Sequence, residues 1–138
     1  MNRGQKALAA ALALLLGVTG CNSSGLVEVT GRLTHNGRAV PSTRVYFQPD
    51  DGSRRSTGLT DDDGNFSLRF SSQQSGVKPG PHTVYVKYEV SADEETHQIQ
   101  PKADKQLRAV IGRYSDPKNS ALHYEVSRNG QHFNIELK

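Results

Sequence analysis

From residue 26 onward, hydrophobic and polar residues alternate with a period of two, and this pattern constrains the fold more than any other feature. Val27, Val29 and Leu33 share one face of the first segment, while charged and hydroxyl-bearing residues occupy the other. The same alternation recurs in six later segments, 44–48, 56–60, 66–70, 84–90, 122–126 and 133–137. Because successive side chains of a strand point to opposite faces, each segment is predicted to be a strand with one buried face.

Dipeptides typical of tight turns separate these segments. Glycine and asparagine adopt positive φ at low cost, and such pairs occur at 36–37, 51–52, 63–64 and 129–130. Short strands at this spacing indicate an all-β fold, a seven-stranded antiparallel sandwich formed by one domain over residues 26–138. Phe66, Val86 and Phe133 are predicted to point into its core.

One segment, residues 91–116, departs from the alternation. It begins with an acidic run at 93–95 and continues past Pro101 into a mixed stretch. A short helix is predicted after this proline from the spacing of Leu107, Val110 and Ile111. We expect the segment to be an exposed connection and a candidate contact site, since long loops on a rigid scaffold often carry function.

The N-terminal residues have the pattern of an export signal. Arg3 and Lys6 precede an apolar run at 7–18 of Ala, Leu and Val. This run is well short of the roughly 20 apolar residues that a membrane-spanning helix needs. Residues 1–20 are therefore predicted to be a signal peptide.

The signal ends in Val-Thr-Gly at 18–20, directly before Cys21, which is the single cysteine of the chain. This ending resembles a bacterial lipobox. The resemblance implies that the Cys21 thiol carries diacylglycerol, that cleavage occurs before Cys21, and that the new N-terminus is acylated. The alternatives are a free thiol or a cut one residue earlier. Residues 21–25 would then form a lipidated tether.

The predicted lipoprotein is placed in the cell envelope. Asn22 follows the cysteine, where aspartate would resemble an inner-membrane retention signal, so we expect the outer membrane. Removing Arg3 and Lys6 with the signal lowers the formal net charge from +3 to +1. We therefore expect no nucleic-acid partner, since such partners need clustered basic residues.

Five short segments resemble the carboxypeptidase regulatory-like domains, whose fold is similar to that of transthyretin (prealbumin). They are VTGRL at 29–33, NGRAVP at 36–41, VYF at 45–47, TDDDGNF at 60–66 and PGPHTV at 79–84. IGRYSDP at 111–117 and a closing hairpin at 122–137 resemble small bacterial lipoproteins that carry this domain. The resemblance implies an accessory β-sandwich for binding, adhesion or assembly, and it supplies no particular activity.

Three adjacent carboxylates at 61–63 offer the hard oxygen ligands that calcium prefers. The spacing of an EF-hand is absent, and an exposed turn closed by Asp63-Gly64 explains the same residues. The turn is the favoured interpretation, with calcium at Asp61 and Asp63 as the alternative.

Five histidines are spread along the chain without the close pairing of a metal site. We interpret them as surface residues, with His82, His123 and His132 at outward strand positions or strand starts. Iron dioxygenases that share the transthyretin-like fold bind iron through Tyr and His side chains, which draws attention to Tyr114, His123 and Tyr124. The His-x-His pattern that would support such a site is missing from the sequence.

Hydrolytic motifs are also missing from the sequence. No serine stands in a G-x-S-x-G setting. The C-terminal residues 134–138 also lack the Tyr-Arg-Gly-Ser tail of ring-opening enzymes that share the transthyretin-like fold. We therefore expect no catalytic residues, no cofactor and no bound metal.

Tyr114 and Asp116 form the least explained motif. Asp116-Pro117 is typical of a turn leading into the next strand, with Tyr114 packed over the sheet edge. The alternative is a recognition site where Tyr114 stacks on a peptide or glycan and Asp116 accepts hydrogen bonds.

The sequence thus predicts a lipid-anchored, non-enzymatic module of binding or structural type, with a protein or glycan partner. An unrecognised hydrolase or metal-dependent enzyme is the alternative function.

Overall fold

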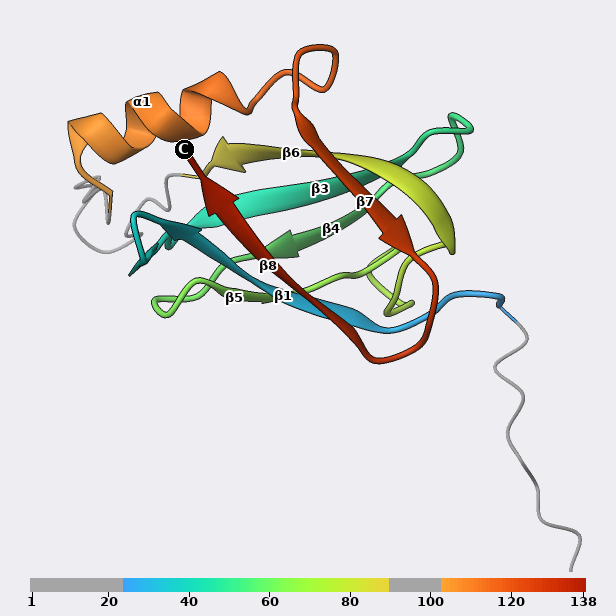
Figure 1. Ribbon diagram of the computed structural model, residues 1–138. Coiled ribbons are helices and arrows are strands. Elements are labelled where there is room, and N and C mark those ends of the chain that lie inside the picture. Colours follow the sequence, from blue (N-terminus) through green and yellow to red (C-terminus); the bar gives the residue numbers. More distant parts are fainter. Residues whose placement is uncertain (1–23, 90–102) are drawn as a thin grey trace, which may run out of the picture.

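Two sheets of four strands lie face to face and enclose the hydrophobic core (Figure 1). The computed structural model describes residues 24–89 and 103–138. The elements in chain order are β1 Val29–His35, β2 Arg38–Ala39, β3 Thr43–Pro49, β4 Ser56–Leu59, β5 Asn65–Ser67, β6 Gly80–Tyr88, α1 Lys105–Arg113, β7 Leu122–Val126 and β8 Gln131–Leu137. The predicted all-β sandwich is confirmed, with a short eighth strand, β2, after the turn at 36–37.

The first sheet is built around β1, which pairs with β2, β5 and β8. The second has the order β4-β3-β6-β7. All pairings are antiparallel except that of β1 with β8, which is parallel from Val29↔Gln131 to His35↔Leu137. The predicted closing hairpin is therefore wrong, since β7 pairs with β6 and β8 with β1. The turn at 129–130 carries the chain from one sheet to the other, where hairpin geometry no longer dictates strand direction.

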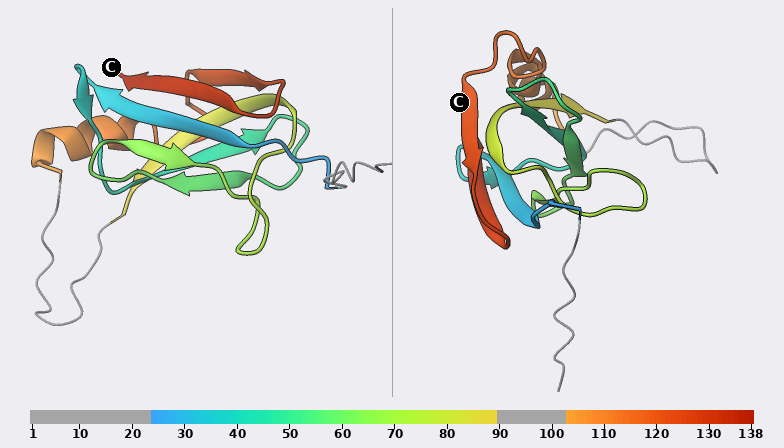
Figure 2. Two further views of the ribbon diagram at one scale, coloured as in Figure 1. Left: turned by 90° about the horizontal axis from the view of Figure 1, so that it is seen from below. Right: turned by 90° about the vertical axis from the view of Figure 1, so that its right-hand side faces the viewer.

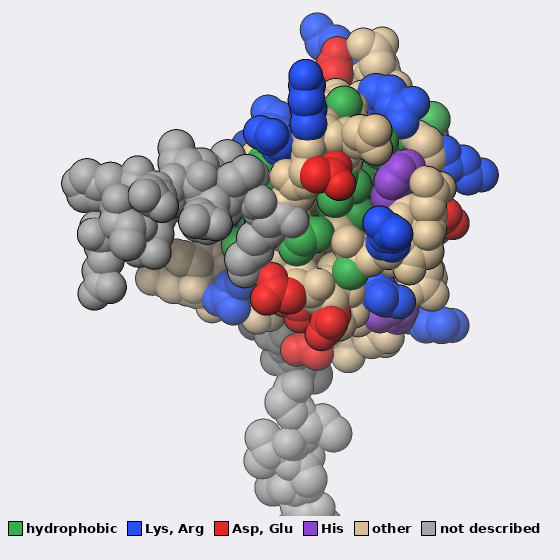
Figure 3. Space-filling view, turned by 90° about the vertical axis from the view of Figure 1, so that its left-hand side faces the viewer, with side chains coloured by type: hydrophobic (Ala, Val, Ile, Leu, Met, Phe, Trp, Pro, Cys, Tyr) green, Lys and Arg blue, Asp and Glu red, His purple; other side chains and the backbone are tan. Residues whose placement is uncertain are grey.

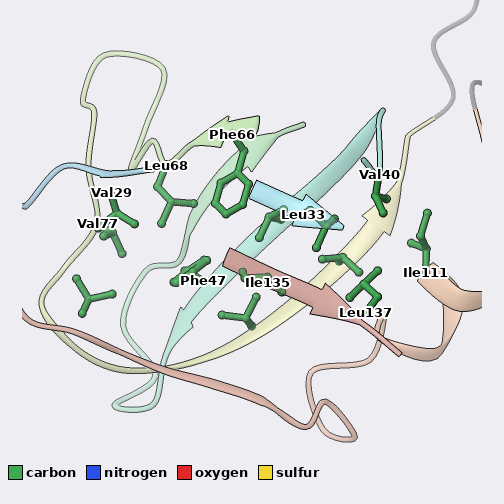
Figure 4. Close-up of a cluster of buried hydrophobic side chains, with 14 of the residues drawn as sticks. Val29, Leu33, Val40, Phe47, Phe66, Leu68, Val77, Ile111, Ile135 and Leu137 are labelled. Atoms are coloured by element: carbon green, nitrogen blue, oxygen red, sulfur yellow. The ribbon is translucent and has the colours of Figure 1, made fainter. Parts of the chain in front are cut away.

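Side chains from both sheets meet in one core, as the alternation predicts (Figure 4). Phe47 of β3, Leu33 of β1 and Ile135 of β8 are at most 1% exposed. Phe66 and Val86 are buried as predicted, whereas Phe133 packs against the core with its side chain only half-buried. Phe133 thus lies on the inner face of its strand, as predicted, but its side chain is less buried than predicted.

The predicted short helix is confirmed as α1, and its packing corrects the expectation for residues 91–116. Asp104 caps the helix by accepting a hydrogen bond from Leu107 N at 2.8 Å. Val110 and Ile111 are 8% and 1% exposed, so the inner face of α1 belongs to the core, while its outer face is exposed. From residue 103 on, the segment is therefore more than an exposed connection, because the apolar face of α1 covers the sandwich. The acidic run 93–95 lies outside the described residues. No helix of the described ranges is long and apolar enough to span a membrane.

The edges of the two sheets meet where β4 and β5 approach each other. Thr57 N donates to Arg69 O at 2.9 Å, and Arg69 N donates to Thr57 O at 2.8 Å. Gly58 is required here, because a Cβ at this position would lie 2.5 Å from the carbonyl oxygen of Ser67. We call this contact, Thr57–Gly58 against Ser67–Arg69, the β4–β5 seam.

The chain enters the domain beside the loop that follows β5. Val27 N donates to Val77 O at 3.0 Å, and Val77 N donates to Val27 O at 2.9 Å. Figure 2 shows this loop projecting from the end of the sandwich where the described chain begins. The predicted lipidation site, Cys21, lies outside the described residues.

Candidate functional site

The aspartate turn at 61–63 is organised by its own backbone. Asp61 Oδ1 accepts hydrogen bonds from the backbone N–H groups of Asp63 and Asn65, both at 2.9 Å. Arg32 Nε donates to the carbonyl oxygen of Asp63 at 3.0 Å. This geometry matches the interpretation of a closed turn. Among the described residues, no group of three or more His, Cys, Asp and Glu side chains is arranged to hold a metal ion.

Tyr114 and Asp116 hold the connection between α1 and β7. The Tyr114 hydroxyl donates to Lys138 O at 3.2 Å and accepts from Lys138 N at 3.0 Å, which fixes the C-terminus. Asp116 accepts from Lys118 N at 2.9 Å and from Asn119 Nδ2 at 2.8 Å. The Asp116 contacts match the predicted turn, and Tyr114 packs against the core. A recognition role for the two residues stays a prediction.

His82 is a core residue, and the prediction of an outward His82 is wrong. Its side chain is 1% exposed, and its ring lies 5.8 Å from that of Phe47. It shares the inward face of β6 with Val84 and Val86, which the alternation along that strand requires. Nδ1 lies 2.8 Å from the Gly80 carbonyl, while buried Nε2 has no partner in the described structure. His123 and His132 are exposed, as predicted.

Four arginines line a hollow of about 680 Å³ on the β4 side of the sandwich. Arg44 comes from β3, Arg54 and Arg55 precede β4, and Arg69 lies at the β4–β5 seam. Hydroxyl groups complete the polar lining, from Thr57, Ser67, Ser71 and Ser72. We call this surface the arginine hollow. In contrast, the end of the molecule at the left of Figure 1 shows basic, acidic and histidine side chains interspersed (Figure 3).

Hydrogen bonds to the protein hold three of these guanidinium groups in place. Arg54 Nε donates to Phe70 O at 3.0 Å, and its guanidinium lies 5.3 Å from the centre of the Phe70 ring. Arg69 Nη2 donates to Ser72 O at 2.8 Å. Arg55 Nη1 donates to the Tyr85 hydroxyl at 2.8 Å. Since a guanidinium carries five N–H groups, each of these arginines keeps others for a ligand.

The guanidinium group of Arg55 lies against a stacked pair of tyrosines. The rings of Tyr46 and Tyr85 are parallel within 1°, with their centres 4.6 Å apart. Arg55 lies 5.0 Å from the centre of the Tyr46 ring, in cation–π geometry. Lys87 Nζ lies 6.0 Å from both rings, so a second cation borders this aromatic pair.

Only one arginine of the hollow is neutralised within the described structure. Arg44 forms a two-point ion pair with Glu89, in which Nη2 donates to Oε2 at 2.9 Å, and this hydrogen bonding raises the pKa of Arg44. The ion pairs found among the described residues are Arg44–Glu89 and Lys78–Asp51, and neither involves Arg54, Arg55 or Arg69. The hollow therefore holds three positive charges without a described counter-charge.

A second hollow, of about 600 Å³, adjoins the first across the β4–β5 seam. The two share Leu59, Ser67 and Arg69. The second also includes Asp61 and Asn65, so one of the predicted calcium ligands lies on this combined surface. Asp63, Tyr114 and Asp116 line neither hollow. We call the two adjoining hollows the groove.

The arginine hollow has no continuous signature in the sequence, because its lining residues are scattered from residue 44 to residue 72. Arg44 and Arg69 each occupy an outward position of an alternating segment, where a solvated charge needs no explanation. The adjacent pair Arg54-Arg55 was the available signal. Only the closure of the sandwich at the β4–β5 seam brings the four together.

No known protein family matches the sequence, and no curated protein does. Among solved structures, the chain is similar to a DUF3823 family protein from Parabacteroides merdae, with 12% identity and a TM-score of 0.43. That match covers 81% of this chain and 45% of the other. It is also similar to a 9R-lipoxygenase from Cyanothece, with 15% identity and a TM-score of 0.36, over 85% of this chain and 17% of the other. The chain thus spans less than half of the length of either protein.

Proposed function

We propose that this protein is a lipid-anchored, non-enzymatic binding module of the cell envelope, with the arginine hollow as its binding surface. The proposed fold type is the carboxypeptidase regulatory-like domain, on the sequence segments that resemble it. The lipid anchor is proposed at Cys21, from the lipobox-like ending of the signal.

One observation carries the binding role, namely the three arginines that face a concave surface without a described counter-charge. Charges of one sign gathered in a hollow repel each other and destabilise the folded state unless a partner neutralises them. Guanidinium and hydroxyl groups hold such a partner by donating hydrogen bonds, and no covalent chemistry is needed. Binding is therefore the function that this chemistry favours.

Membrane attachment is tested by the variant Cys21→Ser in the full chain. We expect the wild type to partition into the detergent phase and the variant to lose this partitioning, because the thiol carries the anchor. Cys21→Ala serves as a second variant, and the circular dichroism spectrum reports that the domain is folded in each. If either variant partitions as the wild type does, the anchor is not at Cys21.

A further inference from the structure

We propose that the groove binds an acidic glycan, a sugar chain bearing carboxylate groups, with its charged groups at the arginine end. This inference rests on the proposed binding function and names the ligand class of the same surface. Four properties of the groove support it, which are charge, preorganisation, chemical mixture and shape.

The positive charge of the arginine hollow indicates how many acidic groups its ligand carries. Arg54, Arg55 and Arg69 have no described carboxylate partner, whereas Arg44 is already paired with Glu89. A guanidinium binds one carboxylate through two parallel N–H groups. Three such groups on one surface match a ligand with repeated acidic groups better than one with a single charge.

Preorganisation favours a specific ligand over diffuse charge attraction. Each of the three arginines is fixed by a hydrogen bond of 2.8 to 3.0 Å to the protein. The ordering of long side chains is a main cost of binding, and here it is largely met within the folded protein. Arginines placed only for diffuse attraction would need no such bonds.

The chemical mixture of the groove points to sugar rather than to bare anions. Leu59 is shared by both hollows and is 48% exposed, the large hydrophobic side chain most exposed to solvent among the described residues. Such a side chain can cover the apolar C–H face of a sugar ring. Asp61 and Asn65 in the second hollow supply oxygen acceptors and an amide for sugar hydroxyls. A polyphosphate would use neither feature.

The shape of the groove argues against two other occupants. A peptide that added as a strand would need the free edge of β4, but Thr57 N and O are already bonded to Arg69. A membrane surface is flat, whereas the arginines line a hollow of about 680 Å³. An extended, flexible and hydroxylated chain fits along the two adjoining hollows.

The test measures binding to the full chain in detergent by titration calorimetry. The probes are tetragalacturonate, digalacturonate, the neutral galactotetraose, inorganic tripolyphosphate and tetraglutamate. We expect tetragalacturonate to bind more tightly than digalacturonate, because two carboxylates cannot engage all three arginines that lack a described partner, whereas a longer chain supplies enough. We expect the neutral sugar, the inorganic anion and the peptide to bind at least about tenfold more weakly.

Two variants locate the site. Arg54→Gln with Arg69→Gln should weaken tetragalacturonate binding by about tenfold for each arginine removed. Arg108→Gln with Arg113→Gln, on the exposed face of α1, removes the same charge and should leave binding unchanged. Thermal melting curves establish that both variants are folded.

Leu59→Ser separates a glycan site from an anion site. It should weaken tetragalacturonate binding and leave the weak binding of tripolyphosphate unchanged, since only the sugar contacts an apolar side chain. Tripolyphosphate or tetraglutamate binding as tightly as tetragalacturonate would overturn the glycan assignment. Binding unaffected by the double arginine variant, or absent for every probe, would overturn the site itself. Neither result bears on the anchor at Cys21, which is tested by partitioning alone.

Discussion

Replacement of Phe47 by alanine tests how the core holds the two sheets together. Phe47 is fully buried, and its ring centre lies 5.7 Å from that of Phe133 and 5.8 Å from that of His82. Tyr124 and Phe66 follow at 6.3 and 6.4 Å. One side chain of β3 therefore contacts aromatic rings from both sheets.

The expected loss follows from this burial. Emptying a fully buried phenylalanine site costs about 3–5 kcal/mol, and Phe47→Ala should reach the upper part of this range because rings on both sheets keep the site from collapsing. Phe133 is half-buried, so Phe133→Ala should cost about 2 kcal/mol. These losses are large beside the roughly 5–15 kcal/mol that stabilises a typical domain.

Urea denaturation followed by circular dichroism measures both losses, together with the double variant. We expect the two rings to be coupled by about 0.5–1.5 kcal/mol, so the double variant should lose less than the sum of the single losses. Phe47→Leu leaves a smaller cavity and provides a folded variant if the alanine variant is too unstable. Equal losses for Phe47→Ala and Phe133→Ala, or strictly additive ones, would refute this account of the core.

Three further predictions concern exposed or tightly packed positions. The hydrogen bond from Lys78, at 2.6 Å, holds the pKa of the Asp51 carboxyl well below its usual range. The ion pair therefore stabilises the fold above about pH 4, and this contribution is lost as the pH falls through the lowered pKa of Asp51. Titration by NMR should show this pKa rising in Lys78→Gln, and an Asp51 that titrates normally in the wild type would contradict the ion pair. Gly58→Ala should destabilise the domain by about 1–3 kcal/mol in urea, because the new Cβ would lie 2.5 Å from a backbone oxygen, whereas Gly112→Ala on the open face of α1 should not destabilise it. Calcium should leave the melting temperature unchanged, since Asp61 Oδ1 already accepts two backbone hydrogen bonds; a calcium-dependent rise that is lost in Asp61→Asn would show a real site.

The sequence predicted the strands well because each buries one face, and burial enforces a strict alternation. Leu33, Phe47 and Ile135 lie on the inner faces that their positions indicated. The same rule, applied to β6, places His82 inward beside Val84. The prediction of a surface His82 is wrong because position along the strand decides its face, although a polar side chain is more often exposed. The imidazole of His82 fits in this core because its ring packs against Phe47 and its Nδ1 lies within hydrogen-bond distance of the Gly80 carbonyl oxygen.

The pairing of strands was harder to predict than their existence. The turn at 129–130 has the residues of a hairpin, yet β7 and β8 lie in different sheets. A local turn signal reports backbone dihedral angles and carries no information on which partner each strand meets. For the same reason the arginine hollow was invisible, because Arg44 and Arg69 become neighbours only through the pairing of whole sheets.

The proposed anchor and the proposed binding surface are linked by one structural contact. Val27, near the start of the described chain, pairs with Val77 at the end of the loop that begins with Arg69. Under the proposed lipidation, the length of the tether 21–25 limits its reach to at most roughly 17 Å. Under this proposal the loop would stay close to the membrane surface, while the groove opens along the β4–β5 seam. A tether of this length would restrict the module to ligands near its own membrane, so lengthening the tether with Gly-Ser repeats should extend its reach in intact cells without changing the affinity measured in detergent. A change in that affinity would mean that the tether itself takes part in binding.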